Sequence, residues 1–366
     1  MTAGTADVSG AGGGAMSPHP PPEPRVLVPL RIDGEPPSLG QTLHALDGET
    51  MGTTWSVRFI GPAGLRDSTI AEAVVHVCDD VIEQMSHWTA ASDLSRFNRA
   101  AVGSVRVLPE GFASVLDAAL RIAAASDGAY DPTAGGLVAL WGFGPTGETA
   151  LAPRHDAPDF RVPSAADRAR VHCGWDSLPW DGERRALTQP GGATLDLSAI
   201  AKGHAVDRVS ELLTRLGLPN HLVEIGGELR GAGLKPDGQP WWVDLEPLSA
   251  DCGLAPVRLA LHGLAVATSG DYRKYYAGAD GHRRSHTLDP RTRQPVAHGL
   301  AAVTVVHDSA MWADGWSTAL MVLGPRDGLA LADRLGLAAL LVRRRTAAEG
   351  GGFEETFSAA MRELML

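Results

Sequence analysis

The sequence predicts an α+β fold in which a mixed, mainly antiparallel sheet is flanked by helices. Short segments rich in β-branched or aromatic residues, bounded by Gly, Asp or Pro, dominate the chain after residue 217. Amphipathic repeats with helical spacing stand before and after this block. Because the strands come mostly in a run rather than in strict alternation with helices, antiparallel pairing is favoured.

The first half of the chain predicts one strand and two helices. From Glu49 onward, larger apolar residues alternate with smaller or polar ones, which is the period of a half-buried strand. A helix follows, for which Asp67 or Ser68 is the predicted cap, and a second helix covers residues 112–126 before Gly128. The strand positions are Thr53, Trp55, Val57 and Phe59, and the apolar positions of the first helix are Ile70, Val74, Val77, Val81 and Met85.

The second half predicts three more helices and a set of short strands. A helix over residues 199–216 should end at Gly217 in a left-handed cap. Residues 311–323 and 325–335 have helical periodicity and are separated at Pro325. The predicted strands cover residues 221–225, 241–245, 265–269, 285–288, 301–306 and 337–342.

Composition changes along the chain suggest how it is organised. Residues 1–44 are rich in Gly and Pro and are expected to form a disordered tail, and residues 45–366 are expected to form a single domain. The Pro-rich stretch from Gly144 to Asp181 is expected to be a surface excursion of that domain.

Charge and hydropathy exclude several classes of protein. The 366 residues carry a net charge of −11, which argues against non-specific nucleic-acid binding. No apolar run is long enough for an integral membrane segment. Three widely separated cysteines predict neither a disulfide framework nor a zinc site. Without a visible signal peptide or lipobox, the chain is expected to be cytoplasmic unless its native start is missing.

Two segments contain residue types suited to a charged ligand. Asp314 and Thr318 lie four residues apart on a predicted helix, so their oxygens share one face and could bind Mg²⁺, although a solvated Asp near a helix start is the simpler interpretation. Residues 196–203 lead into a helix start, where free amides and Lys202 could meet an anion. The alternative for this segment is a helix cap formed by Asp or Ser.

Further segments suggest a general base and a planar ligand. His286 is placed in the predicted strand 285–288 before an Asp-Pro turn and could act as a base, although a structural His is the alternative. Residues 128–133 and 140–144 combine aromatic side chains with glycines, which suits a ring-shaped ligand or ordinary core packing. Trp88 has the same two interpretations.

Taken in order, these segments resemble the ApbE family, the FAD:protein FMN transferases. Eight matches occur in order between about residues 50 and 325, which is far more specific than any one of them. They are Met51 to Trp55, Ser95 to Asn98, Gly128 to Thr133 with Leu140 to Pro145, Asp196 to Gly203 with Asp207, Val223 to Glu228, Thr268 to Arg273, Ser285 to Pro290, and Ala313-Asp314 with Thr318.

The resemblance implies an α+β flavin-transferase fold and a Mg²⁺-dependent reaction with FAD as donor substrate. FMN would be joined through its phosphate to a Thr or Ser of an acceptor flavoprotein, and AMP would leave. His286 would be the base, and Asp314, Thr318 and the backbone carbonyl of Ala199 would hold the metal. The implied FAD contacts are Met51, Trp88, Ala129, Tyr130, Asp131, Asp196, Lys202 and Leu288.

The residues leave other functions open. The same site residues would serve an FAD pyrophosphatase, in which water replaces the acceptor hydroxyl. A non-catalytic FAD-binding protein would not require Asp314 and Thr318, and an interaction domain would bind no FAD at all. The chain departs from the common family pattern at His204, where Tyr is usual, and at Ser317, where some members have an additional acid.

Overall fold

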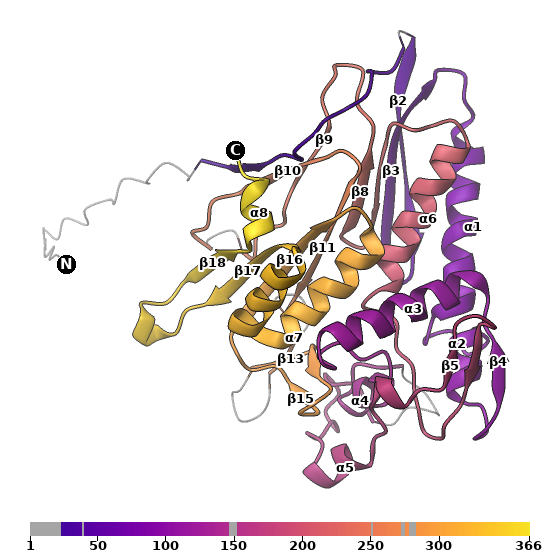
Figure 1. The fold of residues 1–366 in the computed structure, drawn as a ribbon, viewed down its shortest axis with the longest axis vertical. Coiled ribbons are helices and arrows are strands. Elements are labelled where there is room, and N and C mark those ends of the chain that lie inside the picture. The colour runs from indigo at the N-terminus through magenta and orange to yellow at the C-terminus, as the bar shows by residue number, and fades with distance from the viewer. Residues whose placement is uncertain (1–22, 39, 146–151, 250–251, 272–274, 278–282) are drawn as a thin grey trace, which may run out of the picture.

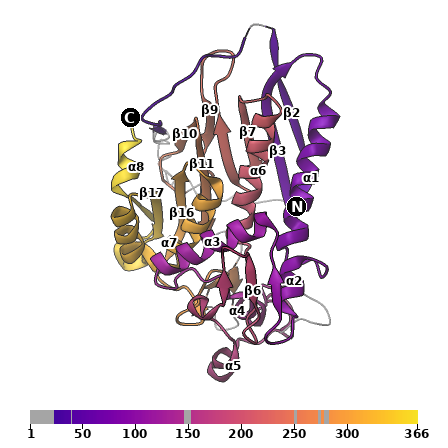
Figure 2. The ribbon, with the colours of Figure 1, turned by 45° about the vertical axis from the view of Figure 1, so that its right-hand side comes forward.

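The computed structural model describes residues 23–38, 40–145, 152–249, 252–271, 275–277 and 283–366. Their principal layers are a twisted antiparallel sheet, a layer of helices on one face and a smaller sheet on the other (Figures 1 and 2). This arrangement confirms the predicted α+β class with mainly antiparallel pairing.

The central sheet has eight strands in the order β18-β17-β16-β11-β8-β7-β3-β2, and every neighbouring pair in it is antiparallel. Side chains alternate between its faces, so Phe59 packs against the helices while Ile60 packs on the opposite side. The strands are β2 (Gln41–Thr50), β3 (Thr53–Pro62), β7 (His221–Ile225), β8 (Glu228–Ala232), β11 (Leu264–Gly270), β16 (Leu300–His307), β17 (Ala338–Arg344) and β18 (Phe353–Phe357).

Four long helices cover one face of this sheet and bury the main core (Figure 1). Helix α6 packs on β7 and β8, α7 packs on β11 and β16, and the two helices pack against each other. Helix α3 contacts both α1 and α7. The four are α1 (Asp67–Met85), α3 (Glu110–Ala125), α6 (Ala201–Arg215) and α7 (Ala310–Leu335).

A three-stranded sheet covers the other face and forms a second core. Its order is β1-β10-β9, in which β1 (Arg25–Leu27) lies parallel to β10 (Val257–Leu261) and β10 lies antiparallel to β9 (Trp241–Asp244). Helix α8 (Ala359–Glu363) adds Met361 to the same core. The second layer therefore joins segments from early and late in the chain.

Shorter elements complete the described structure. They form three small sheets and several brief helices, most of them in the lower part of the view in Figure 1. They are α2 (Asp93–Asn98), β4 (Val105–Val107), α4 (Gly135–Leu140), α5 (Ala165–Arg170), the 3₁₀ turns Trp175–Ser177 and Ala347–Glu349, β5 (Trp180–Asp181), β6 (Ala186–Thr188), β12 (Tyr275–Ala277), β13 (Arg283–Ser285), β14 (Leu288–Asp289) and β15 (Gln294–Pro295).

Most of the predicted long elements are confirmed, and two local details are wrong. Gly217 has the predicted left-handed conformation, and α7 breaks at Gly324, just before Pro325. The cap of α1 is Arg66, without a side-chain hydrogen bond, rather than Asp67 or Ser68. The predicted strand 285–288 is split into β13 and β14, and His286 lies between them. His286 is therefore not a strand residue, contrary to the prediction.

The structure can be compared with the predicted tail boundary at residue 45 and with the predicted surface excursion 144–181. Strand β1 and the first residues of β2 form paired strands on the tail side of the expected boundary at residue 45, whereas residues 1–22 lie outside the described ranges. Within the predicted excursion, residues 146–151 are likewise not described, and the rest carries only α5, a 3₁₀ turn and β5.

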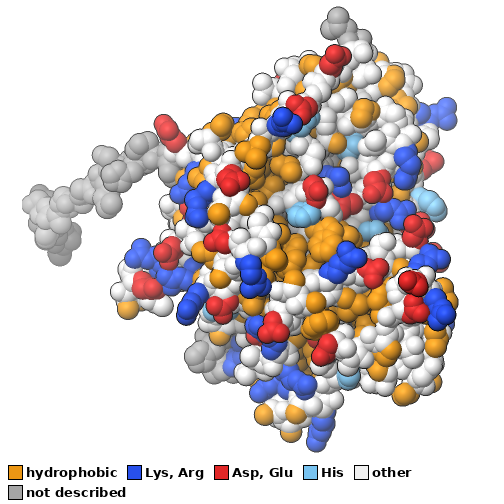
Figure 3. All heavy atoms as spheres, in the orientation of Figure 1, with side chains coloured by type: hydrophobic (Ala, Val, Ile, Leu, Met, Phe, Trp, Pro, Cys, Tyr) orange, Lys and Arg blue, Asp and Glu red, His pale blue; other side chains and the backbone are white. Residues whose placement is uncertain are grey.

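The surface carries charges of both signs (Figure 3), and the three cysteines are not paired with one another. Figure 3 shows acidic and basic side chains mixed over one face, with hydrophobic side chains between them. Cys78, Cys173 and Cys252 are all free thiols. None of the helices in the described ranges has the length and apolar character that crossing a bilayer requires.

Helices α6 and α7 approach closely at Gly203, which makes this glycine a sensitive position. A Cβ atom there would lie 2.2 Å from the carbonyl oxygen of Ala310 and 2.8 Å from the Cα of Met311. We expect Gly203→Ala to destabilise the protein by about 1–3 kcal/mol, because this overpacking outweighs the helix propensity of Ala. Urea unfolding would measure the change.

Gly64→Ala is the matched control, because a Cβ at Gly64 meets no atom within 4 Å. Its stability should change little. Equal stability of the Gly203→Ala variant and the wild type would contradict the described helix contact.

Candidate functional site

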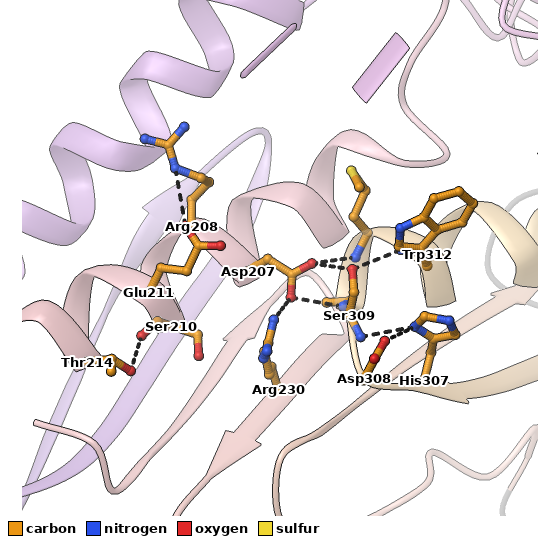
Figure 4. A network of polar contacts seen from close by, with 12 residues as sticks. Asp207, Arg208, Ser210, Glu211, Thr214, Arg230, His307, Asp308, Ser309 and Trp312 are labelled. Carbon is orange, nitrogen blue, oxygen red and sulfur yellow. Dashed lines mark hydrogen bonds and ion pairs between the residues drawn. The ribbon is translucent and has the colours of Figure 1, made fainter. Parts of the chain in front are cut away.

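A buried carboxylate fixes the start of α7 on α6 (Figure 4). Asp207 accepts hydrogen bonds from the Ser309 hydroxyl at 2.6 Å, from the Ala310 amide at 2.9 Å and from the Met311 amide at 3.0 Å. It also forms an ion pair with Arg230 from β8. Two of the free amides at the helix N-terminus are thereby satisfied. Asp207 therefore sets the position of the helix that carries Asp314 and Thr318.

One turn further along α7, Asp314 belongs to a cluster of two buried carboxyls and one partly exposed amine. Its Oδ2 accepts a hydrogen bond from the Gly203 amide at 3.1 Å, and its Oδ1 lies 4.0 Å from Nζ of Lys202. The same Nζ lies 2.5 Å from Oε1 of Glu228 on β8, and no partner is found for Glu228 Oε2. Two buried carboxyls thus share one ammonium group.

The charges in this cluster oppose one another. Burial raises the pKa of Glu228 to about 7, because the charge of Asp314 adds to the desolvation cost and Lys202 offsets only part of it. Burial likewise raises the pKa of Asp314, against the opposing effects of Lys202 and the Gly203 amide. Since one ammonium faces two carboxyls, a bound cation would relieve the remaining repulsion.

Two hydroxyl side chains follow Asp314 within about one turn of α7. Thr318 Oγ1 and Ser317 Oγ each lie 2.8 Å from Ser269 Oγ, which comes from β11. A side chain at Gly315 would contact Ile200, so the loop that contains Ala199 packs beside the Asp314 turn. These are hard oxygen donors, the type that Mg²⁺ prefers, so the residues present fit this metal. The described residues contain no group of three or more His, Cys, Asp or Glu arranged for a metal.

A second polar pair involves Asp196, just before α6. Its Oδ1 lies 3.2 Å from Nδ1 of His87 and accepts a hydrogen bond from the Ser198 amide at 2.8 Å. Burial would raise the pKa of Asp196, but His87 and Ser198 outweigh it and lower the value to about 2. The Trp88 ring lies 5.1 Å from the His87 ring and is 62% exposed. The side-chain cap considered for this segment is absent, since Ile200 precedes α6.

The buried Tyr130 is affected by the charges of both polar groups. Its hydroxyl is buried and has no hydrogen-bond partner. Burial raises its pKa well above the usual value, and the charges of Asp314, Asp196 and Asp131 add to this. The Asp131 carboxylate accepts hydrogen bonds from the backbone and side chain of Thr133, both at 2.7 Å. The charges of Asp314 and Asp196 therefore both act on the Tyr130 hydroxyl.

The remaining predicted residues lie in apolar or turn positions. Met51 has a φ of 51° in the turn between β2 and β3 and packs against the main core, and Ala129 is buried. Leu288 packs with Leu137 and Trp141. The His286 ring meets Phe143 edge-on at 6.2 Å. Tyr272 and Arg273, part of one matched motif, lie outside the described residues.

A sequence model described as the ApbE family matches residues 51–341. The chain belongs to the ApbE family. It is 35% identical over 321 residues to a protein of Vibrio cholerae named FAD:protein FMN transferase, covering 87% of this chain and 92% of the relative. It is 34% identical over 332 residues to a protein of Klebsiella pneumoniae with the same name, covering 90% of this chain and 92% of the relative.

Solved structures of the ApbE family have the same fold. The apo crystal structure of the Pseudomonas stutzeri flavinyl transferase ApbE superimposes with a TM-score of 0.78 and 41% identity, covering 89% of this chain and 98% of that one. The flavin transferase ApbE of Vibrio cholerae gives a TM-score of 0.75 at 34% identity, covering 88% and 99%. The flavin-transferase fold predicted from the ApbE motifs is confirmed.

Two departures from the common ApbE pattern have local explanations. His204 is buried in α6, and burial together with the charge of Arg208 lowers its pKa to about 4, so it is a neutral core residue. Ser317, where some members have an acid, donates a hydrogen bond to the carbonyl oxygen of Asp314 at 2.9 Å. The hydroxyl therefore supports the Asp314 turn without adding charge.

Sequence reasoning did not single out three polar residues of this region. Glu228 and Ser269 lie inside matched ApbE motifs, but only the packing of β8 and β11 beside α6 and α7 brings them to Lys202 and Thr318. His87 adjoins Trp88 in sequence, and that proximity was the available signal.

Proposed function

We propose that this chain is an FAD:protein FMN transferase. A Thr or Ser oxygen of the acceptor protein forms a bond to the FMN phosphorus, the pyrophosphate bond of FAD breaks, and AMP leaves. The acceptor hydroxyl loses its proton in the same reaction. The observation that carries this proposal is the cluster of Lys202 with the buried Asp314 and Glu228, which can neutralise phosphate and metal charges side by side.

In this function, Asp314, Thr318 and the Ala199 carbonyl hold Mg²⁺. When bound, the metal supplies neutralisation of the negative charge that the phosphate oxygens carry. Lys202 contributes a second positive charge, and Glu228 orients its amine through the 2.5 Å contact. The Asp207 network keeps α7, and with it Asp314 and Thr318, in place.

The FAD molecule would extend from this cluster along the remaining predicted residues. Trp88, Tyr130 and Leu288 offer aromatic or apolar contacts to its rings. Asp131 and Asp196 offer carboxylate oxygens to its hydroxyl and N–H groups. Met51 and Ala129 shape the boundary of the site. His286 takes the proton of the acceptor hydroxyl as general base.

The test is an incubation of the purified protein with FAD and Mg²⁺, with and without an acceptor protein that has an exposed Thr or Ser. We expect the acceptor mass to rise by one FMN unit with an equal amount of AMP. AMP with free FMN alone would instead indicate an FAD pyrophosphatase. FAD binding without AMP would indicate a flavin carrier, and no binding would contradict the proposal.

A further inference from the structure

We propose that His87 is a further FAD-binding residue, which donates a hydrogen bond from Nε2 to an acceptor atom of bound FAD. This inference rests on the proposed function and adds to it a contact that the predicted set of site residues does not contain. Three observations on the described residues carry it: the burial of the His87 side chain, the pairing of one ring nitrogen, and the lack of a partner for the other.

Among the described residues, the His87 ring has a polar partner at Nδ1 but not at Nε2. Its side chain is 10% exposed, and its Nδ1 lies 3.2 Å from the Asp196 carboxylate. Nε2, at the other end of the ring, is buried and has no hydrogen-bond partner. A buried polar atom without a partner costs about 1–3 kcal/mol, and a hydrogen bond to a bound ligand would recover that cost.

The charge state of the pair suits a donor at Nε2. Burial opposes a charge on His87, but the charge and hydrogen bond of Asp196 outweigh it and raise the pKa of the imidazole. Asp196 is itself held ionised by the same contact. A protonated ring carries N–H groups on both nitrogens, so one donates to Asp196 while the other remains for a ligand.

The surroundings indicate where that ligand lies. Tyr130, whose hydroxyl is also buried and unpartnered, is close enough to Asp196 and Asp314 for both charges to affect it. The exposed Trp88 ring adjoins His87 on another side. Asp196 is thus common to both unpartnered atoms: it contacts the His87 ring, and its charge acts on the Tyr130 hydroxyl together with that of Asp314, which belongs to the cluster where FAD is proposed to bind.

Two variants separate a donor role from a structural one. Asn at position 87 places its amide near the Nδ1 position, so H87N keeps a donor to Asp196 and loses the one at Nε2. Gln reaches further, so H87Q keeps a donor near the Nε2 position. The experiment measures the Kd of FAD by flavin fluorescence with Mg²⁺ chelated, and the melting temperature of each protein without FAD.

We expect H87N to raise the Kd of FAD by about 10- to 100-fold, the range for one hydrogen bond to a charged group. H87Q should stay within a few-fold of the wild type, and neither variant should melt at a lower temperature than the wild type without FAD. Riboflavin and ADP as separate probes show which part of FAD accepts the bond: the variant weakens riboflavin binding if the acceptor is on the flavin and ADP binding if it is on the pyrophosphate.

The experiment distinguishes a failure of the His87 inference from a failure of the proposed function. If the wild-type protein binds FAD and H87N binds it equally well, this inference is wrong and the proposed function stands. Equal weakening in H87N and H87Q would also overturn it, because the loss would then come from the Asp196 pair rather than from Nε2. If the wild-type protein does not bind FAD, the proposed function fails first.

Discussion

Asp314→Ala is expected to reduce FMN transfer by about 10³-fold or more while the fold persists. In the proposed function, this carboxylate holds the cation and lies 4.0 Å from Nζ of Lys202. The methyl group of Ala cannot bind the cation, so the several kcal/mol by which the cation stabilises the charge on the phosphate oxygens would be lost. Stability should change little, because the lost hydrogen bond from the Gly203 amide is offset by the lost desolvation cost of a buried carboxyl. AMP release and the melting temperature measure the two effects.

Asp308→Ala is the matched control for this variant. Asp308 precedes α7 by two residues, its side chain is 80% exposed, and its contact is with His307. Its replacement should leave the rate of AMP release unchanged. Wild-type turnover by Asp314→Ala at low Mg²⁺ would rule out Asp314 as a metal ligand.

Asp207→Ala is expected to lower the free energy of unfolding by about 3–5 kcal/mol. Asp207 accepts hydrogen bonds from Ser309 and from the amides of Ala310 and Met311, and it forms an ion pair with Arg230. The change therefore leaves a partly buried guanidinium and two helix N-terminal amides without their acceptor. Urea unfolding would measure the loss.

Glu211→Ala provides the comparison on the same helix. Glu211 is 55% exposed and lies 4.0 Å from Arg208, so its loss should cost less than about 0.5 kcal/mol. Replacing Arg230 by Met in the Asp207→Ala background should recover part of the stability, because no charge is then left unpaired. Equal stability of the Asp207→Ala and Glu211→Ala variants would show that the network does not hold α7.

Periodicity was sufficient for the long elements of the fold. In helix α1 and strand β3, the residues that pack into the main core recur at the interval of their element. The prediction of a strand over residues 285–288 was wrong, because a pattern of four residues does not show whether a segment pairs continuously. In the structure, β13 pairs with β12 before His286 and β14 pairs with β15 after it. Strand β1 was missed because its three residues become a strand only through pairing with β10.

The site was predictable where its residues are neighbours in sequence. Asp314 and Thr318 share a helix, and Lys202 follows Asp196 within one loop and turn. Glu228 and His87 could not be found in this way, because their significance comes from contacts with Lys202 and Asp196 on other elements. Burial, which makes an unpaired Nε2 or Oε2 noticeable, is a property of the folded chain alone.

The joining of early and late segments in the second layer has a consequence for how the protein forms during translation. Leu27 bridges to Met365, and the Val28 amide donates to the Leu364 carbonyl oxygen at 2.7 Å. Met361 is fully buried in the same core. Contacts of such large sequence separation close late and slowly. The part of the second core that Met361 completes therefore stays open until residues 361–366 emerge from the ribosome, after β9 and β10 have already been synthesised.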